Sequence, residues 1–115
     1  MNVTLDKLPA LVQEELDAAN RDNPPFHSLH EAYGVLTEEV EETKELMELL
    51  DLEMRDFWGA TRCDDMPRAG RIARGICHDA TEAAAELLQV AAMAQKAYHY
   101  VRSHKAEEAQ HKNGI

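Results

Sequence analysis

The 115-residue sequence contains few of the residues that build sheets, disulfide frameworks or membrane spans. Aromatic residues make up 5%, and the only cysteines are Cys63 and Cys77. Two distant thiols are too few for a disulfide framework or a four-ligand zinc site, so we expect free thiols in a reducing cytoplasm. No apolar run approaches the roughly 18 residues of a membrane span, and the first residues lack a basic-then-apolar signal pattern. These absences favour a cytoplasmic protein that does not enter a membrane.

Positive charge is also scarce. Lysine and arginine number 12 against 22 aspartates and glutamates, which gives a formal net charge of -10. Bare nucleic acid is therefore not an expected partner, because binding its phosphates requires many lysines and arginines. The excess carboxylates fit either a solvated acidic surface or ligands for divalent cations.

The apolar residues that are present recur at three- and four-residue steps, which is typical of amphipathic helices. The first helical pattern ends at Pro24 and Pro25. The second starts where Ser28 and Glu31 match a capping box. Glycines and prolines from Gly59 onward separate the second pattern from the third. The sequence predicts one all-α domain, 1–115. Its expected parts are an N-terminal helix at 1–23, a first acidic helix at 27–57, a second acidic helix at 67–104 and a frayed tail at 105–115.

The two long helices are expected to form an antiparallel hairpin, with the N-terminal helix beside it. Such a hairpin carries more apolar surface than one chain can cover. A homo-oligomeric helical bundle, dimer or tetramer, is the simplest way to bury the remainder.

One acid of the first acidic helix falls on its apolar side. At about 100° per residue, Glu39 lies inside the apolar arc between Leu46 and Ala32, and Glu42 lies at its edge. A carboxylate inside a bundle must be paired, protonated or bound to a metal. Glu39 and Glu42 are neighbours at i and i+3, so their mutual repulsion favours a cation between them over a salt bridge.

The second acidic helix offers a complementary set of oxygen ligands. Asp79, Glu82, Glu86 and Gln89 follow one another at steps of three, four and three along one edge of its apolar arc. In an antiparallel hairpin this edge can approach Glu39. Oxygen ligands from facing helices suit a hard cation such as Mg²⁺.

These residues resemble a known family. The stretches "NPPFHSLHEAYGVLTEEVEE" (23–42) and "ELLQVAAMA" (86–94) are similar to those of small MazG-like all-α nucleoside triphosphate pyrophosphohydrolases of phages and bacteria. The resemblance covers about two thirds of the chain. The family motif, Glu-Glu-x-x-Glu followed by Glu-x-x-Asp, matches at Glu38, Glu39, Glu42 and Glu86. Gln89 stands where the family has aspartate, and a glutamine carbonyl can bind Mg²⁺ but adds no charge.

The resemblance implies Mg²⁺-dependent cleavage of a nucleoside triphosphate into a monophosphate and pyrophosphate, with Mn²⁺ as a possible substitute. It assigns catalytic roles to Glu38, Glu39 and Glu42. Of these, Glu38 or Glu42 would orient the attacking water. The candidate metal ligands are Glu39, Glu42, Glu86, Gln89, Asp79 and Glu82. The candidate phosphate- and base-binding residues are Arg71, Arg74, Lys96 and Trp58.

Two other functions stay open. Gln89 favours a MazG-like module that binds a nucleotide or a protein with weak or no catalysis. A structural helical oligomer would instead pair Glu39 with Arg71 or Arg74.

Overall fold

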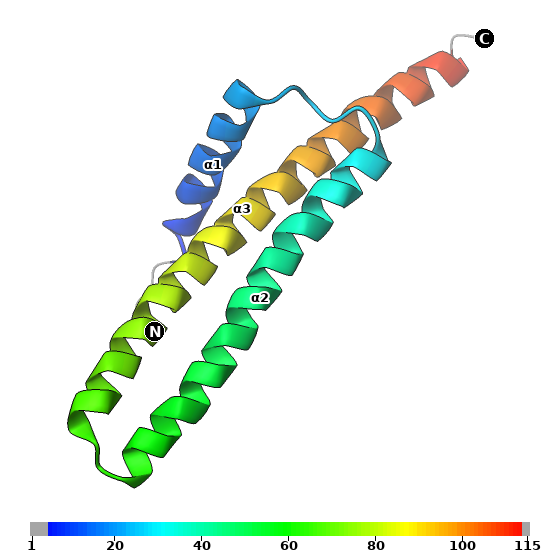
Figure 1. Ribbon diagram of the computed structural model, residues 1–115. Helices are drawn as coiled ribbons and strands as arrows, with labels where there is room; N and C mark the ends of the chain where they lie inside the picture. The colour runs from blue at the N-terminus through cyan, green and yellow to red at the C-terminus, as the bar shows by residue number, and fades with distance from the viewer. Residues whose placement is uncertain (1–4, 114–115) are drawn as a thin grey trace. The chain divides into compact units, whose positions relative to one another are not determined.

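The computed structural model describes the backbone of residues 5–113 and the side chains of residues 5–105 (Figure 1). Its helices are α1 (Leu8–Asp22), α2 (Leu29–Arg62) and α3 (Met66–Asn113). Residues 5–113 contain no strand. The predicted all-α class is therefore confirmed. Over the same residues, no helix has the length and apolar character needed to cross a membrane.

The starts of the helices follow the local sequence signals. α1 begins at Leu8 with Pro9 in its first turn, where proline costs no helical hydrogen bond. The Ser28 hydroxyl accepts a hydrogen bond from the Glu31 backbone N–H at 3.0 Å, as the capping box predicts. Residues 1–4 of the expected N-terminal helix lie outside the described residues.

The ends of the two long helices differ from the prediction. α2 continues to Arg62 rather than stopping near Phe57, because the single Gly59 does not break a helix that is packed along its length. α3 begins at Met66 and continues to Asn113, so the tail expected to fray after His104 is helical through Asn113. Residues 114 and 115 lie outside the described range.

The turn between α2 and α3 is short and has a specific backbone. Asp64 has a φ of 51°, a left-handed conformation that aspartate tolerates better than most residues. The Asp65 side chain then accepts a hydrogen bond from the Arg68 backbone N–H at 3.2 Å and caps the start of α3. The chain therefore reverses direction over only three residues.

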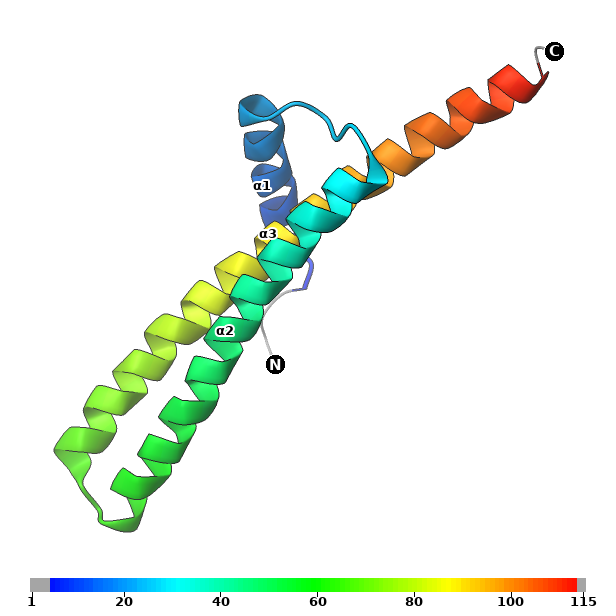
Figure 2. The same cartoon turned by 45° about the vertical axis from the view of Figure 1, so that its right-hand side comes forward.

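Contacts divide the chain into two compact units. The first unit comprises residues 1–38 and 88–115, and the second unit comprises residues 39–87. In the second unit, the α2 and α3 segments lie side by side and run in opposite directions, as the views in Figures 1 and 2 both show.

The second unit is held together by a seam of buried and half-buried residues that alternate at steps of three and four. This is the spacing of a coiled-coil interface, where one stripe of each helix faces its neighbour. On α2 the seam contains Glu39, Thr43, Leu46, Leu50, Glu53, Phe57 and Ala60. On α3 it contains Ile72, Ile76, Asp79, Ala83 and Glu86.

This seam corrects the apolar arc expected for α3. Asp79 and Glu86 were expected at the edge of that arc, but they lie in the seam itself. The apolar residues Ala80, Ala84 and Leu87 are instead exposed, Leu87 by 53%. The inward stripe of α3 is thus rotated toward its acids.

The first unit has a small core built from α1, the connection after it, the start of α2, and α3. Leu16, Phe26, Ala32 and Ala92 are its buried apolar side chains, at 2%, 6%, 3% and 0% exposure. The Tyr100 hydroxyl donates a hydrogen bond to the His27 carbonyl at 3.3 Å and joins α3 to that connection. Lys96 is buried in the same unit, at 7% exposure.

Candidate metal centres

Three glutamates of the second unit form a first cluster. Glu39 and Glu42 come from one turn of α2, and Glu86 comes from α3; one oxygen of each lies within 4.8 Å of the other two. Glu39 and Glu86 are half-buried in the seam, while Glu42 is exposed. The Thr43 hydroxyl donates to the Glu39 carbonyl at 3.0 Å, so this turn of α2 is also fixed on its buried side. Helix periodicity places Glu39 beside Glu42, and the pairing of α2 with α3 brings Glu86 to them.

The spacing of these oxygens fits a small divalent cation. Mg²⁺ holds its ligands at about 2.0–2.1 Å in an octahedron, so ligand oxygens lie roughly 2.9–4.2 Å apart. A mutual separation within 4.8 Å is close to that range. In addition, Oε2 of Glu86 is buried and has no hydrogen-bond partner among the described residues. A buried carboxylate oxygen of this kind is stabilised by a cation or a proton.

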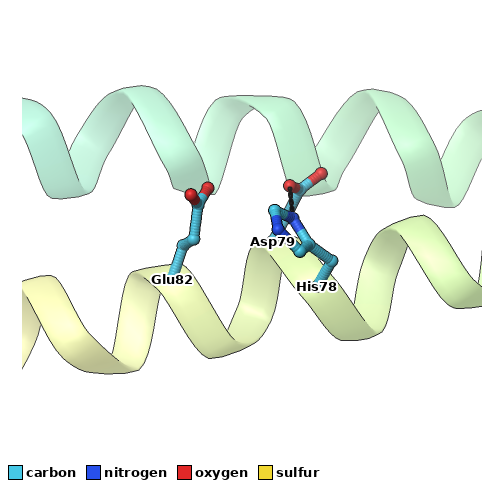
Figure 3. A group of neighbouring side chains, drawn as sticks. All are labelled: His78, Asp79 and Glu82. Carbon is cyan, nitrogen blue, oxygen red and sulfur yellow. Dashed lines mark hydrogen bonds and ion pairs between the residues drawn. The ribbon is translucent and has the colours of Figure 1, made fainter.

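A second cluster lies elsewhere in the same unit and contains a histidine. His78, Asp79 and Glu82 project from one side of α3, and each offers a ligand atom within 4.8 Å of the others (Figure 3). His78 Nδ1 lies 3.1 Å from Asp79 Oδ1. The side chain of Asp79 is 16% exposed and that of His78 is 71% exposed, so the cluster runs from the seam to the surface.

Glu53 of α2 faces this second cluster. Burial, followed by the hydrogen bond and negative charge of Asp79, raises the pKa of Glu53 above its usual 4.5. The hydrogen bond from His78 is the main cause that lowers the pKa of Asp79 below 3.8. The same bond and the charge of Glu82 raise the pKa of His78 above 6.5. Relative to the free side chains, the cluster therefore favours the protonated forms of Glu53 and His78 and the ionised form of Asp79.

Gly75 makes room for the Glu53 carboxylate. A Cβ at this position would lie 2.9 Å from Glu53 Oε2, closer than an ordinary contact. Glycine inside a helix costs about 0.5–1 kcal/mol relative to alanine, so its presence here has a steric explanation.

The two clusters open on the same side of the second unit. Each residue of a helix is rotated by about 100° from the one before it. Because the two segments run in opposite directions, the residues immediately before the seam residues lie on the same side of the pair in both helices. This side, the acidic side, carries the exposed Glu42, Glu45, His78 and Glu82, together with Leu49 and Leu52. Both clusters are thus reachable from solvent.

Residues that follow a seam position fall on the opposite side, which is mostly apolar. This side, the apolar side, carries nine apolar residues: Val40, Met47, Met54 and Trp58 on α2, and Ala73, Cys77, Ala80, Ala84 and Leu87 on α3. Lys44, Asp51 and Thr61 of α2 lie on the same side. All nine apolar residues are exposed, Met47 by 53% and Trp58 by 60%. An exposed surface this rich in apolar residues is typical of an interaction surface.

The candidate site residues proposed from the sequence do not form a single site in the structure. Asp79 and Glu82 belong to the second cluster rather than to the cluster around Glu39. The second cluster also contains His78 and is faced by Glu53, and neither residue was a candidate from the sequence. Exposed Glu38 and half-buried Gln89 belong to the first unit.

The candidate phosphate- and base-binding residues are likewise dispersed. Arg71, Arg74 and Trp58 are exposed in the second unit, whereas Lys96 is buried in the first. The sequence signals that could have identified Glu53 and His78 are the three- and four-residue steps that place Glu53 in the seam and the direct adjacency of His78 to Asp79.

Comparisons of the chain with protein-family models, with curated proteins and with solved structures find no match.

Proposed function

We propose that the protein is a Mg²⁺-dependent hydrolase that converts a nucleoside triphosphate into a monophosphate and pyrophosphate. The observation that carries this proposal is the first cluster, in which oxygens of Glu39, Glu42 and Glu86 converge within 4.8 Å. The resemblance of residues 23–42 and 86–94 to MazG-like pyrophosphohydrolases supplies the reaction. The cytoplasm is the proposed compartment.

In this proposal Glu39, Glu42 and Glu86 hold the metal. When bound, Mg²⁺ neutralises phosphate oxygens and fixes their position, which is most of what phosphoryl chemistry requires from a protein. Mn²⁺ prefers similar oxygen ligands and is expected to substitute. Glu42 is exposed, so its carboxylate can also contact the attacking water; Glu38 is the alternative that the family motif provides.

The proposal includes a second copy of the chain as a partner. The apolar side leaves nine apolar residues exposed, which favours a homo-oligomeric bundle in which these surfaces face each other. Because the clusters open on the acidic side, assembly through the apolar side leaves Glu42, His78 and Glu82 accessible. Membranes and nucleic acids are not among the proposed partners.

Pyrophosphate release from a panel of ribo- and deoxynucleoside triphosphates, with Mg²⁺ and with chelator, tests the reaction. We expect metal-dependent pyrophosphate without stepwise inorganic phosphate. Glu39→Gln should abolish turnover, whereas Glu48→Gln, an exposed glutamate of the same helix outside both clusters, should leave it unchanged. Normal hydrolysis by the Glu39→Gln variant would show that Glu39 is not a metal ligand.

The second candidate function is a nucleotide- or protein-binding module with weak or no catalysis. It is favoured by Gln89, which replaces the aspartate of the family motif and contributes no charge. A protein that Mg²⁺ stabilises against heat, but that releases no pyrophosphate from any nucleotide, would support this function over the enzyme.

A further inference from the structure

A cavity of about 310 Å³ lies in the first unit, between the end of α1, the connection that follows it, and α3. The volume is at the lower end of the range of small-molecule sites. Its walls include Asn20 and Asn23 near the end of α1, Phe26 in the connection, and Lys96, His99 and Ser103 on α3. Among the residues whose side chains the structure describes, no aspartate or glutamate lines it.

Lys96 gives this cavity an unusual charge. The side chain is 7% exposed, and its ammonium lies 4.8 Å from the centre of the Phe26 ring, which is itself buried. Within residues 5–105, Lys96 takes part in no ion pair or hydrogen bond. The ammonium is not among the fully buried, unpartnered polar atoms of the described residues, so it reaches the cavity, where the aromatic ring satisfies only part of its charge. The chain has a net charge of -10, yet none of the carboxylates in residues 5–105 pairs with this lysine.

The neighbouring groups are suited to an anion that has several oxygens. Asn20 and Asn23 carry amide N–H donors, Ser103 carries a hydroxyl donor, and His99 carries a ring donor. Of these four side chains, only Asn23 has another acceptor within the described part of the chain, a long contact of 3.4 Å from its amide to the Ala19 carbonyl. A phosphate group offers three or more acceptor oxygens and is commonly bound by lysine acting as a point charge.

We propose that this cavity binds a phosphate group, either free phosphate or the phosphate of a small ester, with Lys96 as its anion-binding residue. The site uses none of the residues of the two acidic clusters and needs no metal. The resemblance made Lys96 a candidate phosphate-binding residue of the hydrolase, but binding in this cavity requires neither the acidic clusters nor hydrolysis. It is measured without a metal, so its failure is distinguishable from the failure of the proposed hydrolase function.

Calorimetric titration of the full chain in the presence of EDTA tests the proposal, because the chelator removes any contribution of a metal. The titrants are inorganic phosphate, adenosine 5′-monophosphate and adenosine. We expect the monophosphate, inorganic phosphate or both to bind, and adenosine not to bind. Binding of inorganic phosphate alone would identify the free ion as the ligand, and binding of the monophosphate alone would identify a phosphate ester.

Variants of the lysine complete the experiment. Lys96→Met keeps the length and apolar stem of the side chain but removes the charge, and should weaken binding about tenfold or more, whereas Lys96→Arg keeps the charge and should retain binding. Lys105→Met, which removes an exposed lysine from the same helix, is the matched control and should bind like the wild type. The proposal is overturned if neither phosphate compound binds the wild type, if adenosine binds as well as its monophosphate, or if Lys96→Met binds as tightly as Lys105→Met.

Discussion

Replacing Gly75 by alanine measures how tightly the second cluster is packed. Alanine inside a helix is more favourable than glycine by about 1 kcal/mol. The added Cβ, however, would lie 2.9 Å from Glu53 Oε2, so the carboxylate must retreat by about half an ångström to reach the 3.4 Å of ordinary van der Waals contact. Because that oxygen ends a flexible side chain, the helix can still form. We therefore expect a gain in the free energy of unfolding that is smaller than the full alanine benefit.

Gly70 provides the matched control. It lies in the same helix, and a Cβ there would meet nothing within 4 Å, so Gly70→Ala should show the full gain of about 1 kcal/mol. For 115 residues this corresponds to a rise in Tm of roughly 4 °C. Urea unfolding at one protein concentration, with unchanged slopes, gives the two free energies directly.

A double-mutant cycle with Glu53→Ala separates the steric cause from other effects. Removing the Glu53 carboxylate should restore the full benefit of Gly75→Ala, because the alanine methyl then has space. The reasoning is refuted if Gly75→Ala stabilises the wild type as much as Gly70→Ala does, or if its effect is the same with and without Glu53.

Two further predictions concern proton binding and assembly. The folded-state pKa values of Glu53 and His78 are raised above 4.5 and 6.5, so the stability that each group contributes is complete below its usual pKa and is lost as pH rises through its raised pKa. The pKa of Asp79 is lowered below 3.8, so its contribution is lost only as pH falls through that lowered value. Urea midpoints of the wild type relative to Glu53→Gln should therefore fall as pH rises above 4.5, and a constant difference would contradict this assignment. For assembly, Ala84→Lys on the apolar side should lower the mass measured by light scattering toward that of one chain. Ala85→Lys changes an exposed alanine on the acidic side and should leave the mass unchanged. Equal masses of the two variants would exclude the apolar side as the interface.

Much of the local structure could be predicted from the sequence. The positions of the helices follow from the recurrence of apolar residues every three or four positions. Their starts are marked by residue types that favour a helix N-terminus, Ser28 as a cap of α2 and Pro9 in the first turn of α1. The inward position of Glu39 followed from the same periodicity, and the structure places this residue half-buried in the seam. Helix ends were less predictable, because Gly59 breaks a helix only when packing does not hold it.

The assignment of acids to sites could be predicted only in part. Glu39, Glu42 and Glu86 were expected together and lie together. Asp79 and Glu82 were expected beside them but join His78 and face Glu53 instead. The single cluster expected from the sequence is therefore two clusters, and one of them contains a nitrogen ligand that changes the range of metals it suits.

The sequence by itself thus determined three helices, their charged and apolar stripes, and the turn that places Glu39 beside Glu42. These properties depend on residues within a few positions of one another, whose arrangement is fixed by 3.6 residues per turn. Only the tertiary structure decided which residues of α2 meet which residues of α3, because the register of two helices depends on contacts such as Gly75 with Glu53 that lie 22 positions apart. It also placed Lys96 in a cavity that no carboxylate of residues 5–105 lines, since the burial of a side chain depends on segments that are distant in the sequence.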